Sequence, residues 1–301
     1  MSKKKKISSE DKTAIRATII LTLAFLLLAG IFLFFHKTKP EQPVKPKPAV
    51  VVKISKPVVV PVKTKKPVVG DRIPSAKGAK IAFILDDWGY RMSNCHYLKE
   101  IKAPLAIAVL PNLRHTNDIM KCASVYDKDI MLHLPLEPYH NNDPYPDNYL
   151  ITTKMSRATI EKIIGDTFKK MPLIIGVNNH MGSKATESKL LMKTVFKKIK
   201  EKGLFFVDSM TAPNHSVCGE LADEMNLPFA QRNVFLDNID TREAIEKQIL
   251  DLAQKARRKG YAIAIGHDRP LTMQMLQEEI PILQKQGFEI VHVKDLLRNK
   301  N

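Results

Sequence analysis

The 301-residue sequence has only three cysteines, Cys95, Cys122 and Cys218, and none of them forms a Cys-x-x-Cys pair. This scarcity excludes a cysteine-rich zinc knuckle and a framework of several disulfides. A single disulfide can still form. An exported protein with an odd number of cysteines keeps at least one thiol, which we expect to be a buried apolar residue.

Acidic residues are scarce at the start of the chain. Only 3 of the 31 Asp and Glu residues precede residue 71, against 15 of the 48 Lys and Arg residues, so about +12 of the formal net charge of +17 lies there. The rest of the sequence is nearly balanced in charge, whereas a nucleic-acid-binding domain carries its basic excess on its own folded surface. The charge distribution therefore argues against nucleic acid as a partner.

The first 70 residues divide into three segments. Residues 1–16 form a basic tail, and residues 17–35 are uncharged and long enough, at roughly 28 Å, to cross a bilayer once as a helix. Residues 36–70 are rich in Pro, Lys and Val, which predicts an extended tether. The alternative to an anchor is a cleaved signal peptide, but no small-x-small cleavage site follows the apolar run. The basic tail predicts a single-pass protein of the inner membrane whose C-terminal domain lies on the periplasmic or extracytoplasmic side.

Residues 71–301 are long enough for one domain with a sizeable core. Apolar runs that read as strands alternate with helical patterns, which predicts an α/β fold with a mainly parallel sheet, such as a (β/α) barrel. Two helices have readable ends: Thr186 to Gly203 and Thr241 to Gly260. The expected strands are 81–85, 105–110, 130–134, 174–177, 205–207, 229–235, 262–265 and 290–293.

Polar residues stand where five of these strands end. They are Asp86-Asp87, His133 with Glu137, Asn178-Asn179-His180, Asp208-Ser209, and His267. In a β/α barrel the carboxyl ends of all strands open on one face, where such folds build their sites. Taken singly, an Asp-Asp pair is as often an exposed turn, and a lone histidine is more often packed near a core. Their shared position at strand ends favours a common site.

Five motifs in order cover residues 79–297: ILDDWGY (84–90), LHLPLEP (132–138), GVNNHMGSKAT (176–186), FFVDSMT (205–211) and AIGHDRPLT (264–272). Together they resemble the divergent polysaccharide deacetylase family, a branch of the NodB-like carbohydrate esterases. That resemblance implies a deformed (β/α) barrel, which in this chain would follow the transmembrane helix and the Pro/Lys-rich linker expected above.

The resemblance also implies roles for individual residues. Asp86 would be the general base, and His267, in Ile265-Gly266-His267, the general acid. The metal ligands would be Asp87, His133 and His180, with Glu137 as the next candidate. The residues expected to contact substrate or to support the ligands are Glu137, Asn178, Asn179, Ser183 and Asp208. The Arg-x-Pro-x-Gly and Asp-x-x-Asp-Trp motifs of the active enzymes are not evident.

One carboxylate and two imidazoles suit a divalent metal, zinc above all, and leave coordination positions open. Such a centre can polarise an acetyl carbonyl and activate water. We therefore expect a membrane-anchored, envelope-facing, metal-dependent hydrolase that removes acetyl groups from a polysaccharide or peptidoglycan. The alternative is a catalytically inactive glycan-binding or structural envelope protein on the same fold.

Overall fold

A computed structural model of the chain describes residues 78–140, 143–146 and 149–298. The predicted basic tail, anchor and linker, residues 1–70, lie outside these described residues. Among the helices within the described ranges, none is long and apolar enough to cross a membrane.

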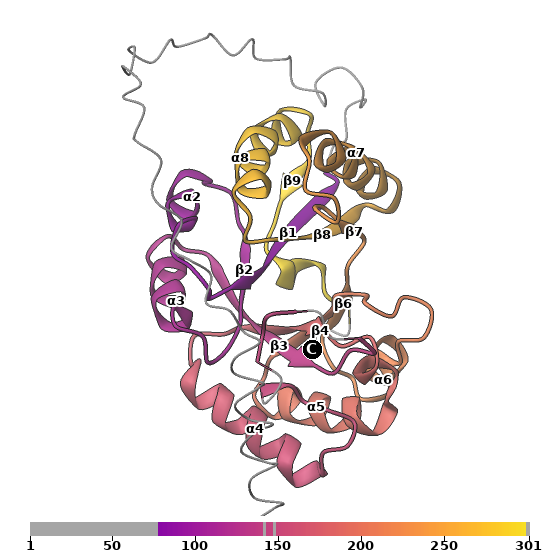
Figure 1. Cartoon of the computed structure of the whole chain (residues 1–301). Coiled ribbons are helices and arrows are strands. Elements are labelled where there is room, and N and C mark those ends of the chain that lie inside the picture. The colour runs from indigo at the N-terminus through magenta and orange to yellow at the C-terminus, as the bar shows by residue number, and fades with distance from the viewer. Residues whose placement is uncertain (1–77, 141–142, 147–148, 299–301) are drawn as a thin grey trace, which may run out of the picture. The chain divides into compact units, whose positions relative to one another are not determined.

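The described part of the chain forms one curled sheet whose strands all pair in parallel (Figure 1). Its strands are β1 (Lys80–Trp88), β2 (Ala106–Val109), β3 (Asp129–Leu136), β4 (Gly176–Met181), β5 (Phe205–Asp208), β6 (Phe229–Gln231), β7 (Val234–Phe235), β8 (Tyr261–His267) and β9 (Glu289–Ile290). The spatial order is β6-β5-β4-β3-β2-β1-β8-β7, and β9 pairs with β1. The predicted parallel α/β architecture is confirmed.

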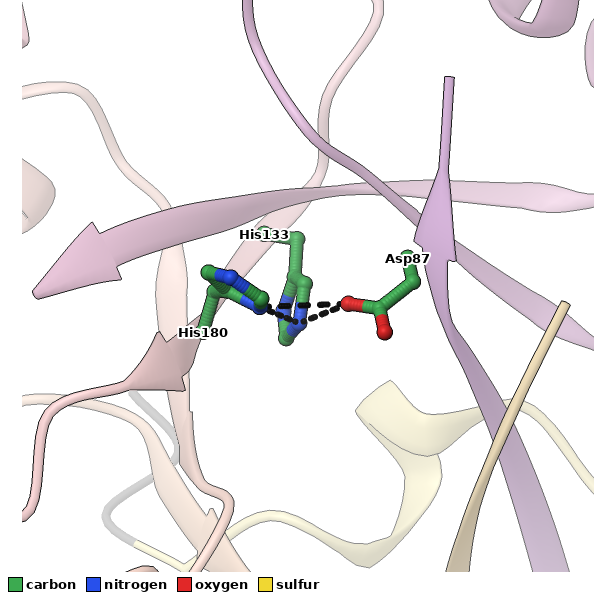
Figure 2. Close-up of side chains that lie close together, drawn as sticks. All are labelled: Asp87, His133 and His180. Atoms are coloured by element: carbon green, nitrogen blue, oxygen red, sulfur yellow. Dashed lines mark hydrogen bonds and ion pairs between the residues drawn. The ribbon is translucent and has the colours of Figure 1, made fainter. Parts of the chain in front are cut away.

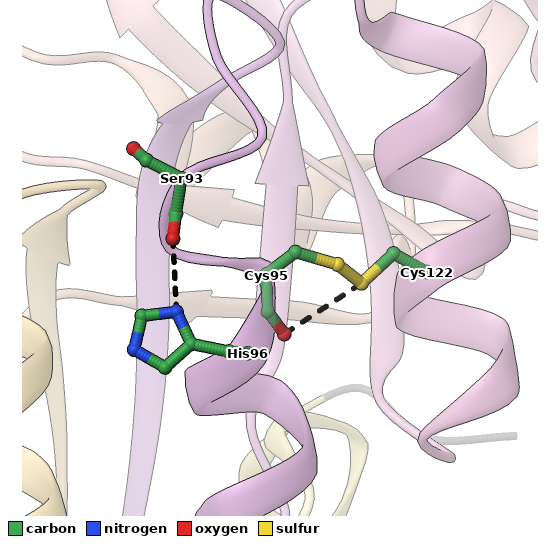
Figure 3. Close-up of a disulfide and its surroundings, with 4 residues drawn as sticks. All are labelled: Ser93, Cys95, His96 and Cys122. Carbon is green, nitrogen blue, oxygen red and sulfur yellow. Dashed lines mark hydrogen bonds between the residues drawn. A yellow bond between two sulfur atoms is a disulfide. The ribbon is translucent and has the colours of Figure 1, made fainter.

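Helices follow most of the strands and cover the outside of the sheet. They are α2 (Cys95–Glu100), α3 (Thr116–Val125), α4 (Arg157–Lys170), α5 (Lys189–Glu201), α6 (Cys218–Glu224), α7 (Arg242–Lys259) and α8 (Pro270–Lys285), with the 3₁₀ turns η2 (Ala185–Glu187) and η3 (Val293–Leu296). A disulfide joins Cys95 in α2 to Cys122 in α3 (Figure 3), whereas Cys218 is a buried free thiol.

The sheet curls into an open barrel, in which the two end strands do not pair with each other. Its two end strands, β6 and β7, are separated in sequence only by Arg232 and Asn233, so the edges of the sheet must lie close together. Asn233 hydrogen-bonds Ile263 of β8 through its backbone N–H and its side-chain oxygen. Sequence patterns predicted one strand over 229–235. That prediction is wrong in detail, because the run breaks at this seam.

Helix ends follow local side-chain chemistry. The predicted α7 is confirmed: Thr241 Oγ1 accepts from Ala244 N at its start, and Gly260 takes the left-handed conformation at its end. The predicted cap of α5 at Thr186 is wrong. Ser188 caps α5 instead by accepting from Leu191 N, and the Thr186 hydroxyl donates to the Gly182 carbonyl.

Candidate metal centre and active site

Side-chain alternation explains why polar groups gather at one mouth of the barrel. In β1, Ala82 and Ile84 belong to the small apolar cluster inside the barrel, while their neighbours pack against the helices. Because strand residues alternate in direction, Asp86 is the next inward position after Ile84. The same alternation leaves polar residues at the last inward positions of other strands: His133, Asn178, His180 and His267.

Asp87 does not follow this alternation, because its backbone conformation departs from that of a regular strand. It has a φ of 63°, in the left-handed region, where the β1–β2 register shifts between Leu85 and Trp88. Asp tolerates this region better than most residues, at a cost of order 1–3 kcal/mol. This bend brings the carboxylate of Asp87 to the same mouth as that of Asp86, so that two consecutive acids contact His133.

Three predicted ligands form a compact triangle (Figure 2). Asp87 Oδ1 lies 3.3 Å from His133 Nε2 and 3.1 Å from His180 Nδ1, and the two nitrogens are 3.2 Å apart. Atoms bound to a tetrahedral zinc ion at about 2.0–2.2 Å are separated by about 3.3–3.6 Å. The triangle therefore has nearly the edge lengths of one face of such a site.

The electrostatics of this cluster suit a cation. Burial alone would raise the pKa of Asp87, but the neighbouring imidazoles of His133 and His180 hold it well below its usual range. Burial alone would lower the pKa of His180, but the neighbouring carboxylates of Asp143 and Asp87 raise it to about 9. Asp87 Oδ1 is nevertheless buried without a well-oriented hydrogen bond. A buried anionic oxygen beside two imidazoles is the donor set that a divalent ion completes.

Asn178 connects the triangle of Asp87, His133 and His180 to Asp86. Its Oδ1 lies 3.0 Å from His133 Nδ1, which leaves His133 Nε2 for the triangle, and its Nδ2 donates to Asp86 Oδ1 at 2.8 Å. Burial raises the pKa of the Asp86 carboxyl, although His133 and His267 act against the rise. Asp86 is thus a fixed, buried carboxylate beside the triangle, with a raised affinity for a proton.

His267 is held by a carboxylate that the sequence analysis missed. Asp237 is fully buried, and its Oδ1 lies 2.8 Å from His267 Nδ1, while its Oδ2 accepts from His267 N and Thr272 Oγ1. His267 Nε2 lies 3.8 Å from Asp87 Oδ2. Burial alone would lower the pKa of His267, but Asp237 raises it. The result is an imidazole with a raised affinity for a proton, whose Nε2 faces the triangle.

A sequence signal for Asp237 did exist. Residues 237–240 read Asp-Asn-Ile-Asp and lack only the Trp of the Asp-x-x-Asp-Trp motif. Asp143 was also missed: it lies in the loop between β3 and α4, 3.3 Å from His180 Nε2, and no local pattern distinguishes it from other loop acids.

The remaining predicted residues hold loops together. Glu137 Oε1 pairs with Lys184, and Oε2 accepts from Thr153, so its carboxylate is engaged away from the triangle. Asn179 links to Ser209 N, and Ser183 Oγ accepts from Tyr139 N. Asp208 accepts from Met210 N and Ser216 Oγ. The suggestion of Glu137 as the next metal ligand is not supported by this arrangement.

Comparison with known proteins finds one family model that matches most of the described chain. Residues 83–297 match the family described as "Divergent polysaccharide deacetylase". Uncharacterized protein YibQ of Escherichia coli K12 is 33% identical over 201 residues, which cover 67% of this chain and 62%, less than two thirds, of the E. coli protein. An uncharacterized protein of Haemophilus influenzae Rd is 30% identical over 222 residues, which cover 74% of this chain and 78% of that protein.

The fold has a solved counterpart. The crystal structure of uncharacterized protein ATU2773 from Agrobacterium tumefaciens C58 matches with a TM-score of 0.69 at 20% identity, covering 76% of this chain and 93% of that one. At 20% identity the match shows a shared fold and nothing more.

Proposed function

Because the chain belongs to the divergent polysaccharide deacetylase family, we propose that it is a membrane-anchored, metal-dependent hydrolase that removes acetyl groups from an envelope glycan. The observation that carries this proposal is the triangle of Asp87, His133 and His180, whose edges are 3.1, 3.2 and 3.3 Å. No other group of three or more His, Cys, Asp or Glu side chains in the described ranges has such spacing.

The proposed ligand atoms are Asp87 Oδ1, His133 Nε2 and His180 Nδ1. Two imidazoles and one carboxylate make a borderline donor set that suits zinc. A divalent ion bound there would polarise an acetyl carbonyl and lower the pKa of a water molecule. Asp87 is the least buried of the three ligands, with 29% of its side chain exposed, so the site faces the mouth of the barrel.

The proton transfers fall to two residues outside the triangle. Asp86 accepts the proton of the attacking water as the water oxygen bonds to the acetyl carbon. His267 Nε2 donates its proton to the sugar nitrogen or oxygen as the bond from the acetyl carbon breaks, and acetate leaves. Asp237 holds the opposite nitrogen of His267, which keeps the donor aimed at the cluster.

The proposed location is the extracytoplasmic side of the inner membrane. The uncharged run of residues 17–35 supports the anchor, although it lies outside the described residues. The disulfide between Cys95 and Cys122 adds independent support, because such bonds persist in oxidising compartments and are rare in the cytosol.

The test is acetate release from acetylated polysaccharides and peptidoglycan by the full-length protein. Asp86→Asn and His267→Ala should each lower the rate by roughly 10² or more, the scale for loss of a positioned acid or base. Both variants should keep the metal content of the wild type. His292→Ala removes an imidazole that pairs with Asp129 away from the triangle, and this control should keep its rate.

The outcome of this test also decides between an enzyme and a binding protein. If the wild type binds metal and glycan but releases no acetate from any acetylated glycan, the hydrolase proposal is wrong. The protein would then be a glycan-binding member of the family.

A further inference from the structure

His180 meets two carboxylates through its two ring nitrogens. Its Nδ1 faces the triangle, 3.1 Å from Asp87 Oδ1, and its Nε2 lies 3.3 Å from Asp143 Oδ1. The side chain of His180 is only 5% exposed. Nε2 is buried and has no well-aligned hydrogen bond among the described residues, so the Asp143 carboxylate is the acceptor positioned to receive its proton.

Asp143 is anchored to the body of the domain through Tyr145. Asp143 Oδ1 accepts from Tyr145 N at 2.8 Å, and the buried Tyr145 hydroxyl donates to the Pro111 carbonyl at 2.9 Å. The Tyr145 ring also meets the His180 ring edge to face, with centroids 5.7 Å apart. A carboxylate on the β3–α4 loop is therefore held against a residue of β4.

The contact between His180 Nε2 and Asp143 bears on metal binding, because the position of the proton on an imidazole decides which nitrogen can bind a metal. A neutral imidazole that binds a metal through Nδ1 must carry its proton on Nε2, and a buried N–H needs an acceptor. His133 has the opposite arrangement. Asn178 Oδ1 lies beside its Nδ1, which leaves Nε2 for the metal. The two histidines thus face the triangle through opposite nitrogens.

We propose that Asp143 is a positioning residue for the metal centre, which holds the Nε2–H tautomer of His180 so that the Nδ1 lone pair points at the ion. This inference rests on the proposed metal site. It adds a residue of the β3–α4 loop to the determinants of metal affinity. The 3.3 Å contact should shorten when the ion binds, because charge-assisted N–H···O bonds are about 2.7–2.9 Å long.

The test is zinc affinity of the full-length protein in detergent, measured by competition with a chromophoric chelator. Asp143→Ala should weaken zinc binding by about 10–100-fold, the usual cost of removing the partner of a ligating histidine. Asp143→Asn keeps an acceptor oxygen and should lose less. The matched control is Asp129→Ala, which removes the carboxylate beside His292 outside the triangle and should bind zinc as the wild type does.

Two further readouts separate positioning from folding. The cobalt-substituted Asp143→Ala protein should have an altered visible absorption spectrum, and the thermal transition of its metal-free form should match that of the wild type. Zinc affinity within about twofold of the wild type would overturn the inference alone. A lowered metal-free transition with no advantage of Asn over Ala would make Asp143 a folding residue and overturn it as well. A wild type that binds no zinc would overturn the proposed function together with this inference.

Discussion

The candidate centre depends on single residues whose directions are set by the backbone. Two consecutive residues of a strand normally face opposite sides of the sheet. Asp86 and Asp87 reach one site only because Asp87 adopts a φ of 63° at a register shift. The strain of that conformation lies at the site itself, which is where strained residues tend to be functional.

Alanine substitution of His133 or His180 should abolish stoichiometric metal binding. Each change removes one of three ligands, and two remaining ligands hold zinc weakly. Metal content of the purified full-length protein measures this directly, with His292→Ala as a control imidazole away from the triangle. Wild-type metal content in both variants would mean that the ion binds elsewhere.

At the scale of single residues, the sequence predicts which residues belong to the site better than it predicts which side chains contact one another. The acids and histidines of the centre follow apolar runs, so their positions at strand ends were predictable. The partners of these residues were harder to predict. Asp237 contacts His267 across 30 residues of chain, and Asp143 reaches His180 from a loop. Glu137, four residues after His133, was the next candidate after the three expected ligands, yet Lys184 and Thr153 engage its carboxylate.

At the scale of elements, the Cys95–Cys122 disulfide ties α2 to α3. It closes a loop with a sequence separation of 27, and removing such a bridge typically costs about 2–4 kcal/mol. The Cys95→Ser, Cys122→Ser double variant should therefore unfold at a lower temperature than the wild type. Reducing agent should lower the wild type to the same temperature and leave the variant unchanged. The bridge leaves Cys218 as the one free thiol among the three cysteines, so three free thiols in protein prepared from an oxidising compartment would contradict it.

The packing of α8 against α7 contains a buried acid, Glu279. It is 3% exposed, and its Oε2 makes no hydrogen bond in the described chain. Burial raises its pKa to about 7, with help from Glu246 and Glu278. The folded pKa lies above the ordinary value of 4.5, so the contribution of Glu279 to the stability of the fold is fully present below pH 4.5 and is lost as the pH rises through about 7.

Glu279→Gln should accordingly raise the thermal transition temperature at pH 8 and leave it nearly unchanged at pH 4. Glu161 on α4 is the control, since it pairs with Arg157 and takes no part in the electrostatics of Glu279. Arg157 lowers the pKa of Glu161, so Glu161→Gln should slightly destabilise the protein at pH 8. An equal effect of Glu279→Gln at both pH values would exclude titration of this group.

The element pattern was largely readable from sequence because hydrophobic periodicity reports burial. The run 81–85 falls within β1, and Thr241 and Gly260 mark the ends of α7 as predicted. The failures occurred where tertiary contacts override local signals. The 229–235 run breaks because Arg232 turns away to bind the carbonyls of Ser209 and Met210. Leu190 in α5 is 80% exposed, although an apolar side chain alone would predict burial.

At the scale of the whole molecule, we expect the chain to be a single-pass membrane protein with an exported domain. Lys and Arg residues before the apolar run, residues 17–35, favour a cytoplasmic N-terminus. A reporter that folds only outside the cytoplasm, fused after Asn301, should be active, and the intact mass should show that the run is not cleaved. Activity of a reporter that works only in the cytoplasm would reverse this topology.

The central claim is that acetyl hydrolysis depends on one ion held by Asp87, His133 and His180. The most direct measurement is acetate release from acetylated glycan by metal-stripped, full-length wild-type protein during titration with zinc. The account predicts a rate that is near zero without zinc, rises with added zinc and reaches its plateau at about one zinc per chain. A rate that is independent of zinc, or zinc saturation without any acetate release, would contradict it.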